Sequence, residues 1–208
     1  MPTAREALLH AALTALAGRP WAAVRMVDVA SAASVSRQTL YNEFGSKDGL
    51  ARALVRREAD AFLNSVDRVL AERAGTAEQL VRLAEWTVGE ARSRPLLRAL
   101  LTGSWSDRLP APRPVVRSAA GPGVPAQRRA DAGHPAPGEL VAAVRDRAFA
   151  ALEQGCGRRP EEEAAEVAQR CELAVRLALS CVVAGPPEAV GRLVRAAISG
   201  PGWRAAGR

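Results

Sequence analysis

Eighteen residues near the N-terminus, from Val27 to Phe44, constrain the fold of this chain most strongly. They are typical of two short helices joined by a tight turn at Ser34, which is the pattern of a helix-turn-helix. Ser36 is a favourable N-cap for the second helix, and Gly45 is placed to end it. The small core that fixes the crossing of the two helices is predicted to contain Val29, Ala30, Ala33, Val35, Leu40 and Phe44.

The rest of the chain shows helical periodicity and no convincing strand alternation, so we expect an all-α protein. Thr3 and Glu6 form a capping box for the first helix, and Thr76 with Gln79 suggests a second one. We expect an N-terminal three-helix helix-turn-helix domain over residues 1–47 and a C-terminal helical bundle over 48–208. The predicted helices of the bundle cover about 46–71, 76–93, 95–101, 139–155, 160–184 and 188–198.

Residues 102–137 break this pattern, because they hold seven of the 14 prolines and four glycines without a sustained apolar period. We interpret them as an irregular Pro/Gly-rich loop with at most one helical turn after Pro114.

The formal net charge of +7 suits an anionic partner but identifies none. Residues 1–47 contribute only +2, from five cations and three anions. No stretch is long and apolar enough for a membrane span, so a cytoplasmic protein is expected. The three cysteines, Cys156, Cys171 and Cys181, lack the spacing of metal ligands, so no metal site is expected. The sequence also shows no paired-carboxylate, nucleophile–base or phosphate-loop pattern, so neither an enzyme nor a cofactor is expected.

The second motif helix carries polar side chains on the face opposite its core. Arg37 and Tyr41 are four residues apart, as are Gln38 and Asn42, so the four share one surface. Arginine can pair with guanine, and glutamine or asparagine with adenine, at base edges in the major groove of DNA. A generic helical hairpin within a bundle is the alternative, but such a hairpin does not require these four polar residues on one face.

Other side chains near this helix could contact the DNA backbone. The hydroxyl groups of Ser36, Thr39 and Tyr41 can bond to phosphates, which sets the register on DNA rather than the sequence read. Lys47 falls in the first turn of the next helix, where its ammonium and free backbone N–H groups could meet one phosphate. Taken alone, a surface lysine is more simply a solvated charge.

The segment from Ser36 to Lys47, with Asp28-Val29-Ala30 upstream, resembles the DNA-binding region of the TetR/AcrR family. The resemblance covers residues 3–55. It implies a homodimer on a palindromic double-stranded operator, a C-terminal ligand-binding domain, and repression relieved by a small-molecule effector. It also implies a dimer interface built from residues 160–198.

Two positions in the motif depart from the family pattern. Ser34 stands where the family usually has a glycine, and a left-handed backbone there would cost about 1–2 kcal/mol. Arg25 lies near the usual threonine cap, so we expect Arg25 to make the phosphate contact instead. The predicted DNA-binding residues are therefore Arg25, Ser36, Arg37, Gln38, Thr39, Tyr41, Asn42 and Lys47.

In the predicted bundle, Phe62, Trp86 and Phe149 are candidates for lining an apolar ligand cavity, although aromatic side chains in bundles commonly form plain core. Small and apolar residues recur on one face of the predicted helix 160–184. We favour dimerisation for this face over internal core: Ala164, Val167, Cys171, Ala174, Val175, Ala178 and Val182.

The sequence thus favours a ligand-relieved, DNA-binding transcriptional repressor. A helical protein-interaction module without DNA binding remains the alternative, supported by Ser34 in the turn and by the irregular stretch.

Overall fold

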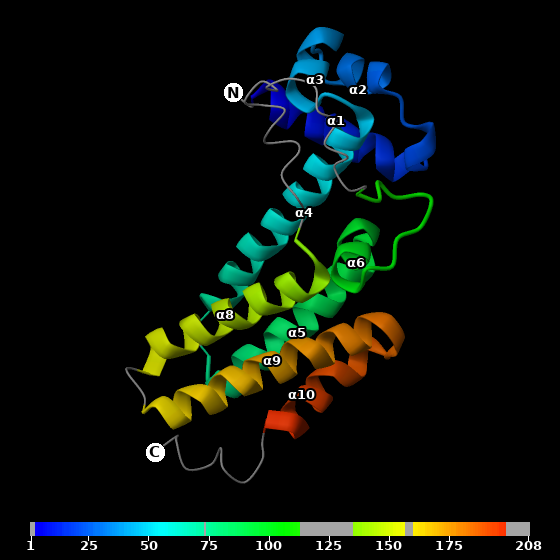
Figure 1. Ribbon diagram of the computed structural model, residues 1–208. Helices are drawn as coiled ribbons and strands as arrows, with labels where there is room; N and C mark the ends of the chain where they lie inside the picture. Colours follow the sequence, from blue (N-terminus) through cyan, green and yellow to red (C-terminus); the bar gives the residue numbers. More distant parts are fainter. Residues whose placement is uncertain (1–2, 73, 113–134, 157–159, 199–208) are drawn as a thin grey trace, which may run out of the picture. The chain divides into compact units, whose positions relative to one another are not determined.

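The computed structural model describes residues 3–72, 74–112, 135–156 and 160–198, and every regular element among them is helical (Figure 1). The chain divides into two compact units, each described here by itself. The first unit comprises Met1–Ala59 and Trp105–Pro135, and the second comprises Asp60–Ser104 and Ala136–Arg208. The division falls inside a long helix, whereas the expected boundary was at residue 47.

The first unit contains α1 (Ala4–Gly18), η1 (Trp21–Ala23), α2 (Met26–Ala32), α3 (Arg37–Phe44) and the first half of α4 (Lys47–Leu70). The capping box that opens α1 is confirmed. The backbone N–H of Glu6 donates to Thr3 Oγ1 at 3.2 Å, and the backbone N–H of Thr3 donates to Glu6 Oε2 at 2.9 Å.

The helix-turn-helix core is confirmed as well. Val29, Ala30, Leu40 and Phe44 are each at most 2% exposed, and Ala33 and Val35 pack against them half-buried. These residues hold α2 against α3 by excluding water from their apolar side chains.

Two positive φ angles shape the ends of the motif. Ser34 adopts φ 54°, which is the left-handed conformation considered for this turn because the resembled family usually has a glycine there. Gly45 adopts φ 69° and ends α3, with its N–H donating to the carbonyl of Tyr41. Glycine suits this position because it carries no Cβ to clash there.

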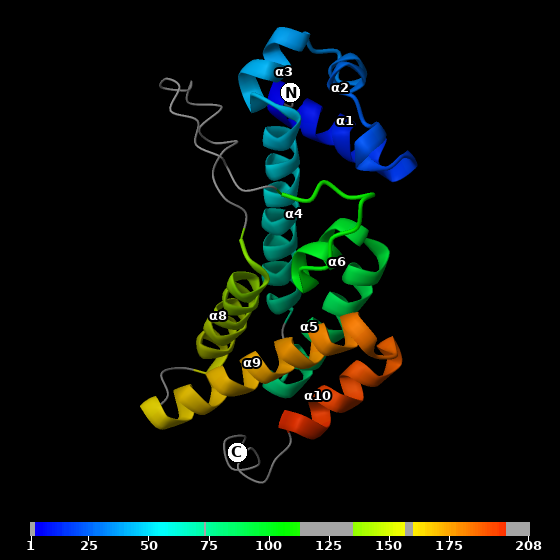
Figure 2. The ribbon, with the colours of Figure 1, turned by 45° about the vertical axis from the view of Figure 1, so that its right-hand side comes forward.

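The second unit contains α5 (Thr76–Ser93), α6 (Pro95–Thr102), α8 (Pro137–Cys156), α9 (Glu161–Ala184), η2 (Pro187–Ala189) and α10 (Val190–Ile198). Within this unit α9 packs against α5, α8 and α10 (Figure 1 and Figure 2). Pro160 precedes three glutamates in the first turn of α9, which favour the positive end of the helix dipole. None of the described helices is long and apolar enough to cross a membrane.

The capping box predicted at Thr76 is wrong. Gly75 is the N-cap of α5 and makes no side-chain cap, while Thr76 is the first helical residue. The amide of Gln79 turns instead to the end of α4, where it donates to the carbonyls of Leu70 at 3.3 Å and Glu72 at 3.2 Å. Leu70 is the last residue of α4 and Glu72 lies just beyond it, so a donor from outside the helix suits both carbonyls.

The preference for dimerisation through the small-residue face of α9 is also wrong. Val167, Cys171, Ala174, Val175, Ala178 and Val182 are all buried inside the protomer, and Ala164 is half-buried. Because α5, α8 and α10 of the same chain contact α9, this face is internal core. Cys171 and Cys181 are buried and are not in a disulfide, whereas the side chain of Cys156 lies outside the described residues.

The irregular stretch begins as predicted. Gly103 ends α6 in the left-handed conformation, and residues 103–112 contain no helix. A hydrogen bond from the Leu109 N–H to the Ser106 carbonyl, 2.9 Å long, forms a turn there. The helical turn predicted after Pro114 lies outside the described residues.

Candidate nucleic-acid interface

The exposed face of α3 carries the four polar residues singled out in the sequence. Arg37, Gln38, Tyr41 and Asn42 are all exposed, and Tyr41 retains 45% of its surface. On the opposite face, Leu40 and Phe44 are fully buried. The helix is therefore anchored through one face, and its amide, guanidinium and phenol groups are exposed on the other.

Two of these side chains are already oriented by each other. Gln38 Nε2 donates to Asn42 Oδ1 at 2.9 Å, one helical turn apart. The bond leaves the Gln38 carbonyl oxygen as an acceptor and the Asn42 amide as a donor. The pair thus offers donor and acceptor groups side by side.

The start of α3 is capped as predicted. Ser36 Oγ accepts from the backbone N–H of Thr39 at 3.0 Å, and the hydroxyls of Ser36 and Thr39 are 2.8 Å apart. Ser36 is exposed and Thr39 is half-buried. In the unbound protein Ser36 therefore caps α3, and the hydroxyls of Ser36 and Thr39 both lie close to the surface of that helix.

Lys47 lies in the first turn of α4 and contacts η1. Its Nζ donates to the carbonyl of Ala22 at 3.1 Å and lies 5.3 Å from the ring centroid of Trp21. Partial burial lowers the pKa of the Lys47 ammonium. An ammonium has three N–H donors, so the bond to Ala22 leaves others available for a phosphate.

Arg25 is the N-cap residue of α2 but makes no side-chain cap. It forms a two-point ion pair with Asp28, from Nε to Oδ2 and from Nη2 to Oδ1, both at 3.0 Å. The hydrogen bond from Arg25 lowers the pKa of the Asp28 carboxyl, and the same bond raises the pKa of Arg25. Arg25 keeps 74% of its side chain exposed, so part of the guanidinium faces solvent.

Sequence analysis missed two arginines in this unit. Arg19 joins the same carboxylate, with Nη1 3.4 Å from Asp28 Oδ2. Arg5 reaches from α1 to Glu43 at the end of α3. Arg5 and Glu43 are 38 residues apart, so no local spacing pattern connects them.

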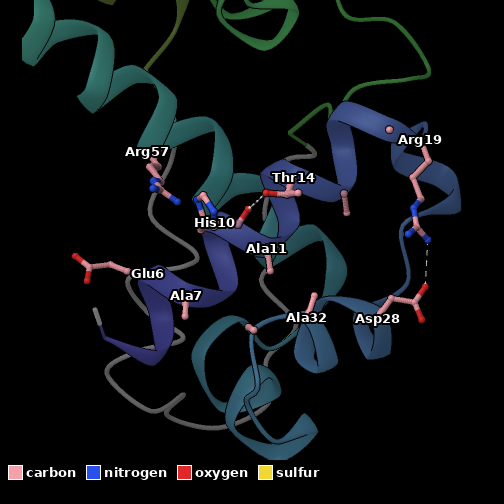
Figure 3. Close-up of a pocket in the computed structure, with 12 residues that line it drawn as sticks. Glu6, Ala7, His10, Ala11, Thr14, Arg19, Asp28, Ala32 and Arg57 are labelled. Atoms are coloured by element: carbon pink, nitrogen blue, oxygen red, sulfur yellow. Dashed lines mark hydrogen bonds and ion pairs between the residues drawn. The ribbon is translucent and has the colours of Figure 1, made fainter. Parts of the chain in front are cut away.

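A groove of about 1040 Å³ lies along α1 in the same unit (Figure 3). Glu6, His10 and Thr14 line it from α1, and Arg57 lines it from α4. No residue of α3 belongs to its lining, so it is separate from the polar face described above. Across the described part of the chain, no group of three His, Cys, Asp or Glu side chains could hold a metal ion.

The structure brings together two of the three predicted ligand-binding residues. Phe62 is fully buried and stacks on Trp86, with ring centroids 5.6 Å apart and an interplanar angle of 11°. Trp86 is half-buried and lines a small cavity of about 380 Å³ between α4 and α5. Phe149, on α8, is half-buried and is not part of that lining.

The comparisons with known proteins agree with this geometry. Residues 8–54 match the family described as bacterial regulatory proteins, tetR family. Over 100 residues, 48% of this chain, the sequence is 39% identical to the HTH-type transcriptional regulator AlkX of Mycobacterium tuberculosis. The match spans 47% of that relative, about half of its length.

Solved structures extend the likeness of the fold over most of the chain. The TetR family repressor AlkX from Dietzia sp. has a TM-score of 0.55 at 24% identity, covering 93% of this chain and 92% of that one. A TetR-family transcriptional regulator from Streptomyces coelicolor has a TM-score of 0.54 at 21% identity, covering 95% and 82%. The family match falls on the same helix-turn-helix whose core and polar face are described above, so this N-terminal part of the chain is similar to the tetR family of bacterial regulatory proteins.

Proposed function

We propose that this protein is a sequence-specific DNA-binding transcriptional regulator of the repressor type, released from DNA by a small-molecule effector. The observation that carries the proposal is the division of α3 into a buried apolar face and an exposed face of Arg37, Gln38, Tyr41 and Asn42. A helix anchored in this way can enter the major groove and present its polar face to base edges.

The chemistry of the face suggests which contacts read bases. The guanidinium of Arg37 suits the two acceptors of guanine. The Gln38–Asn42 pair offers an acceptor and a donor, which matches the donor and acceptor that adenine presents in the major groove. Because the pair is joined before binding, less side-chain freedom is lost on contact with DNA.

Phosphate contacts would set the register of α3 on the duplex. Tyr41 and Thr39 supply hydroxyls, Lys47 supplies an ammonium held beside η1, and Arg25 supplies the exposed part of its guanidinium. Ser36 remains a candidate through the hydroxyl that caps α3. These contacts are sequence-independent and become weaker as salt is raised.

We further propose a cytoplasmic homodimer that places two copies of α3 on a palindromic operator. Residues 160–198 would form the interface through side chains that remain exposed on α9 and α10, including Leu173, Val183 and Leu193. The effector would bind between the helices of residues 47–101 and 139–155, with Phe62, Trp86 and Phe149 as candidate contacts. Its binding would favour a spacing of α3 that no longer fits the operator.

Selection from a pool of random DNA duplexes would test the proposal. Wild-type protein should enrich a palindromic sequence, and the recovered duplex can then be used in shift assays at fixed salt. Tyr41→Ala combined with Lys47→Ala should abolish most of the affinity, while Arg98→Ala on the exposed side of α6, outside the proposed dimer interface, should not. Unchanged affinity in the double variant would contradict the placement of α3. Failure to enrich any duplex would favour the alternative of an interaction module without DNA binding.

A further inference from the structure

Arg5 connects the first turn of α1 to the last turn of α3. Its Nη1 donates to the backbone carbonyl of Glu43 and to Glu43 Oε2, both at 3.3 Å. Its guanidinium carbon lies 4.7 Å from the ring centroid of Phe44. One side chain therefore contacts a carbonyl, a carboxylate and an aromatic face at a single helix end.

The end of α3 needs such a group. The last carbonyls of a helix have no partner within the helix, and the negative end of its dipole favours a cation. The Tyr41 carbonyl accepts from Gly45 at 2.8 Å, and the Phe44 carbonyl accepts from Ser46 at 2.7 Å. The Glu43 carbonyl accepts instead from Arg5, which lies on a different helix.

Of the two residues that Arg5 contacts, Phe44 is fixed in the core and Glu43 lies close to the polar face of α3. Phe44 is 1% exposed and belongs to the core of the first unit. Glu43 directly follows Asn42 and stands two residues after Tyr41. The Arg5 and Glu43 side chains are 25% and 26% exposed, so water screens their ion pair only in part.

We propose that Arg5 is a positioning residue for DNA reading, an inference that rests on the proposed function. It anchors the end of α3, and so sets the direction in which Tyr41 and Asn42 point. It also neutralises the Glu43 carboxylate, which would otherwise repel a nearby phosphate. Arg5 itself touches no base in this scheme.

The geometry requires arginine rather than any cation. The guanidinium is planar, so it can stack on Phe44 while its edge donates to Glu43. An ammonium is a compact point charge and does not stack in this way. Arg5→Lys should therefore preserve the charge and lose most of the positioning.

The test compares binding of two duplexes by wild-type protein, Arg5→Gln, Arg5→Lys and the double variant Arg5→Gln with Glu43→Gln. One duplex is the sequence that wild-type protein selects from a random pool, and the other has the same composition in scrambled order. Stoichiometric titration gives the active fraction of each preparation, so a loss of folded protein is not counted as a loss of affinity.

We expect Arg5→Gln to raise the Kd for the selected duplex about tenfold, the equivalent of one charge-assisted hydrogen bond. The Kd for the scrambled duplex should change much less, so the ratio between the two falls. The Kd of Arg5→Lys for the selected duplex should be close to that of Arg5→Gln. The double variant, which also lacks the Glu43 charge, should recover part of the affinity that Arg5→Gln loses. Arg98→Gln, which removes an exposed arginine of α6 outside the proposed dimer interface, should leave the ratio unchanged.

A lower melting temperature in Arg5→Gln, with the ratio of the two Kd values unchanged, would overturn the positioning role. Wild-type affinity for the selected duplex in Arg5→Lys would overturn it as well. Wild-type protein that selects no duplex would instead refute the proposed function. The two failures are therefore distinguishable in one set of measurements.

Discussion

Lys47 lies over the ring of Trp21, and this contact together with a hydrogen bond to the neighbouring Ala22 holds the start of α4 against η1. Lys47 Nζ lies 5.3 Å from the centroid of the Trp21 ring and donates to the carbonyl of the next residue, Ala22, at 3.1 Å. Trp21 is held in turn by its backbone N–H, which donates to the Arg108 carbonyl at 2.9 Å. The ammonium is thus restricted to one place before any DNA is present, which lowers the entropy lost when it binds a phosphate.

Replacing Trp21 by leucine should weaken DNA binding through Lys47. A cation over an aromatic face gains about 0.5–1 kcal/mol when exposed and more when desolvated. Shift assays on Trp21→Leu, Lys47→Ala and the double variant should give losses that are not additive, because both variants remove the same contact. Trp105→Leu, an indole substitution elsewhere in the first unit, is the control. Strictly additive losses would show that Trp21 does not act through Lys47.

Ser34→Gly should stabilise the first unit. Ser34 adopts φ 54°, and a left-handed residue with a Cβ costs about 1–2 kcal/mol. Glycine removes this strain but gives the unfolded chain more freedom, so the net gain should be about 0.5–1 kcal/mol. Thermal unfolding measures it as a higher Tm. Ser31→Gly, in the helical part of the motif, should lower the Tm instead, and a lower Tm in Ser34→Gly would refute the strain at this turn.

Local signals explain why most of the fold could be predicted from the sequence. The Thr3–Glu6 box, Ser36 at the start of α3 and Pro160 before α9 each act within one helical turn. The polar face of α3 could also be predicted from the sequence, because four-residue spacing alone places its side chains on one side of the helix. A pattern that depends only on neighbouring residues needs no knowledge of the tertiary structure.

The failures all involve partners distant in the sequence. The small-residue face of α9 was compatible with a second copy or with the same chain, and only the packing of α5, α8 and α10 decides for the latter. Arg5 and Glu43 are 38 residues apart, and Arg195 and Glu78 are 117 apart. Similarly, Gln79 donates to the Leu70 carbonyl at the end of α4 and does not form the cap predicted for α5. Periodicity cannot identify which of several elements will supply a partner.

The Phe62–Trp86 stack should contribute to the stability of the second unit. Phe62 is fully buried, and truncating a buried phenylalanine typically costs about 3–5 kcal/mol through lost contacts and the cavity left behind. Phe62→Ala should therefore lower the free energy of unfolding by about that amount in denaturant titrations. Phe62→Leu, which keeps most of the volume, should cost much less. Equal and small effects would show that the ring is not part of a packed core.

The ion pair between α5 and α10 should make stability depend on pH. Arg195 Nη2 lies 2.7 Å from Glu78 Oε2, and Arg82 lies 3.7 Å from the other oxygen. The hydrogen bond from Arg195 is the largest cause that lowers the pKa of Glu78 below its usual value, and the charges of Arg195 and Arg82 lower it further. A carboxyl with a lowered pKa stabilises the fold above its unfolded-state pKa, and this contribution is lost as the pH falls through the folded-state pKa.

Arg195→Gln should therefore raise the pKa of Glu78 towards that of an ordinary glutamate, as measured by carboxyl NMR titration. Wild-type protein should be more stable than the variant near neutral pH, and the difference should shrink as the pH falls through the acidic range in which Glu78 is protonated. High salt should also reduce the difference, because both side chains are partly exposed. Arg192→Gln, on the same helix, should show neither effect. A stability difference that stays constant from neutral to acidic pH would mean that the Arg195–Glu78 pair contributes through packing rather than charge.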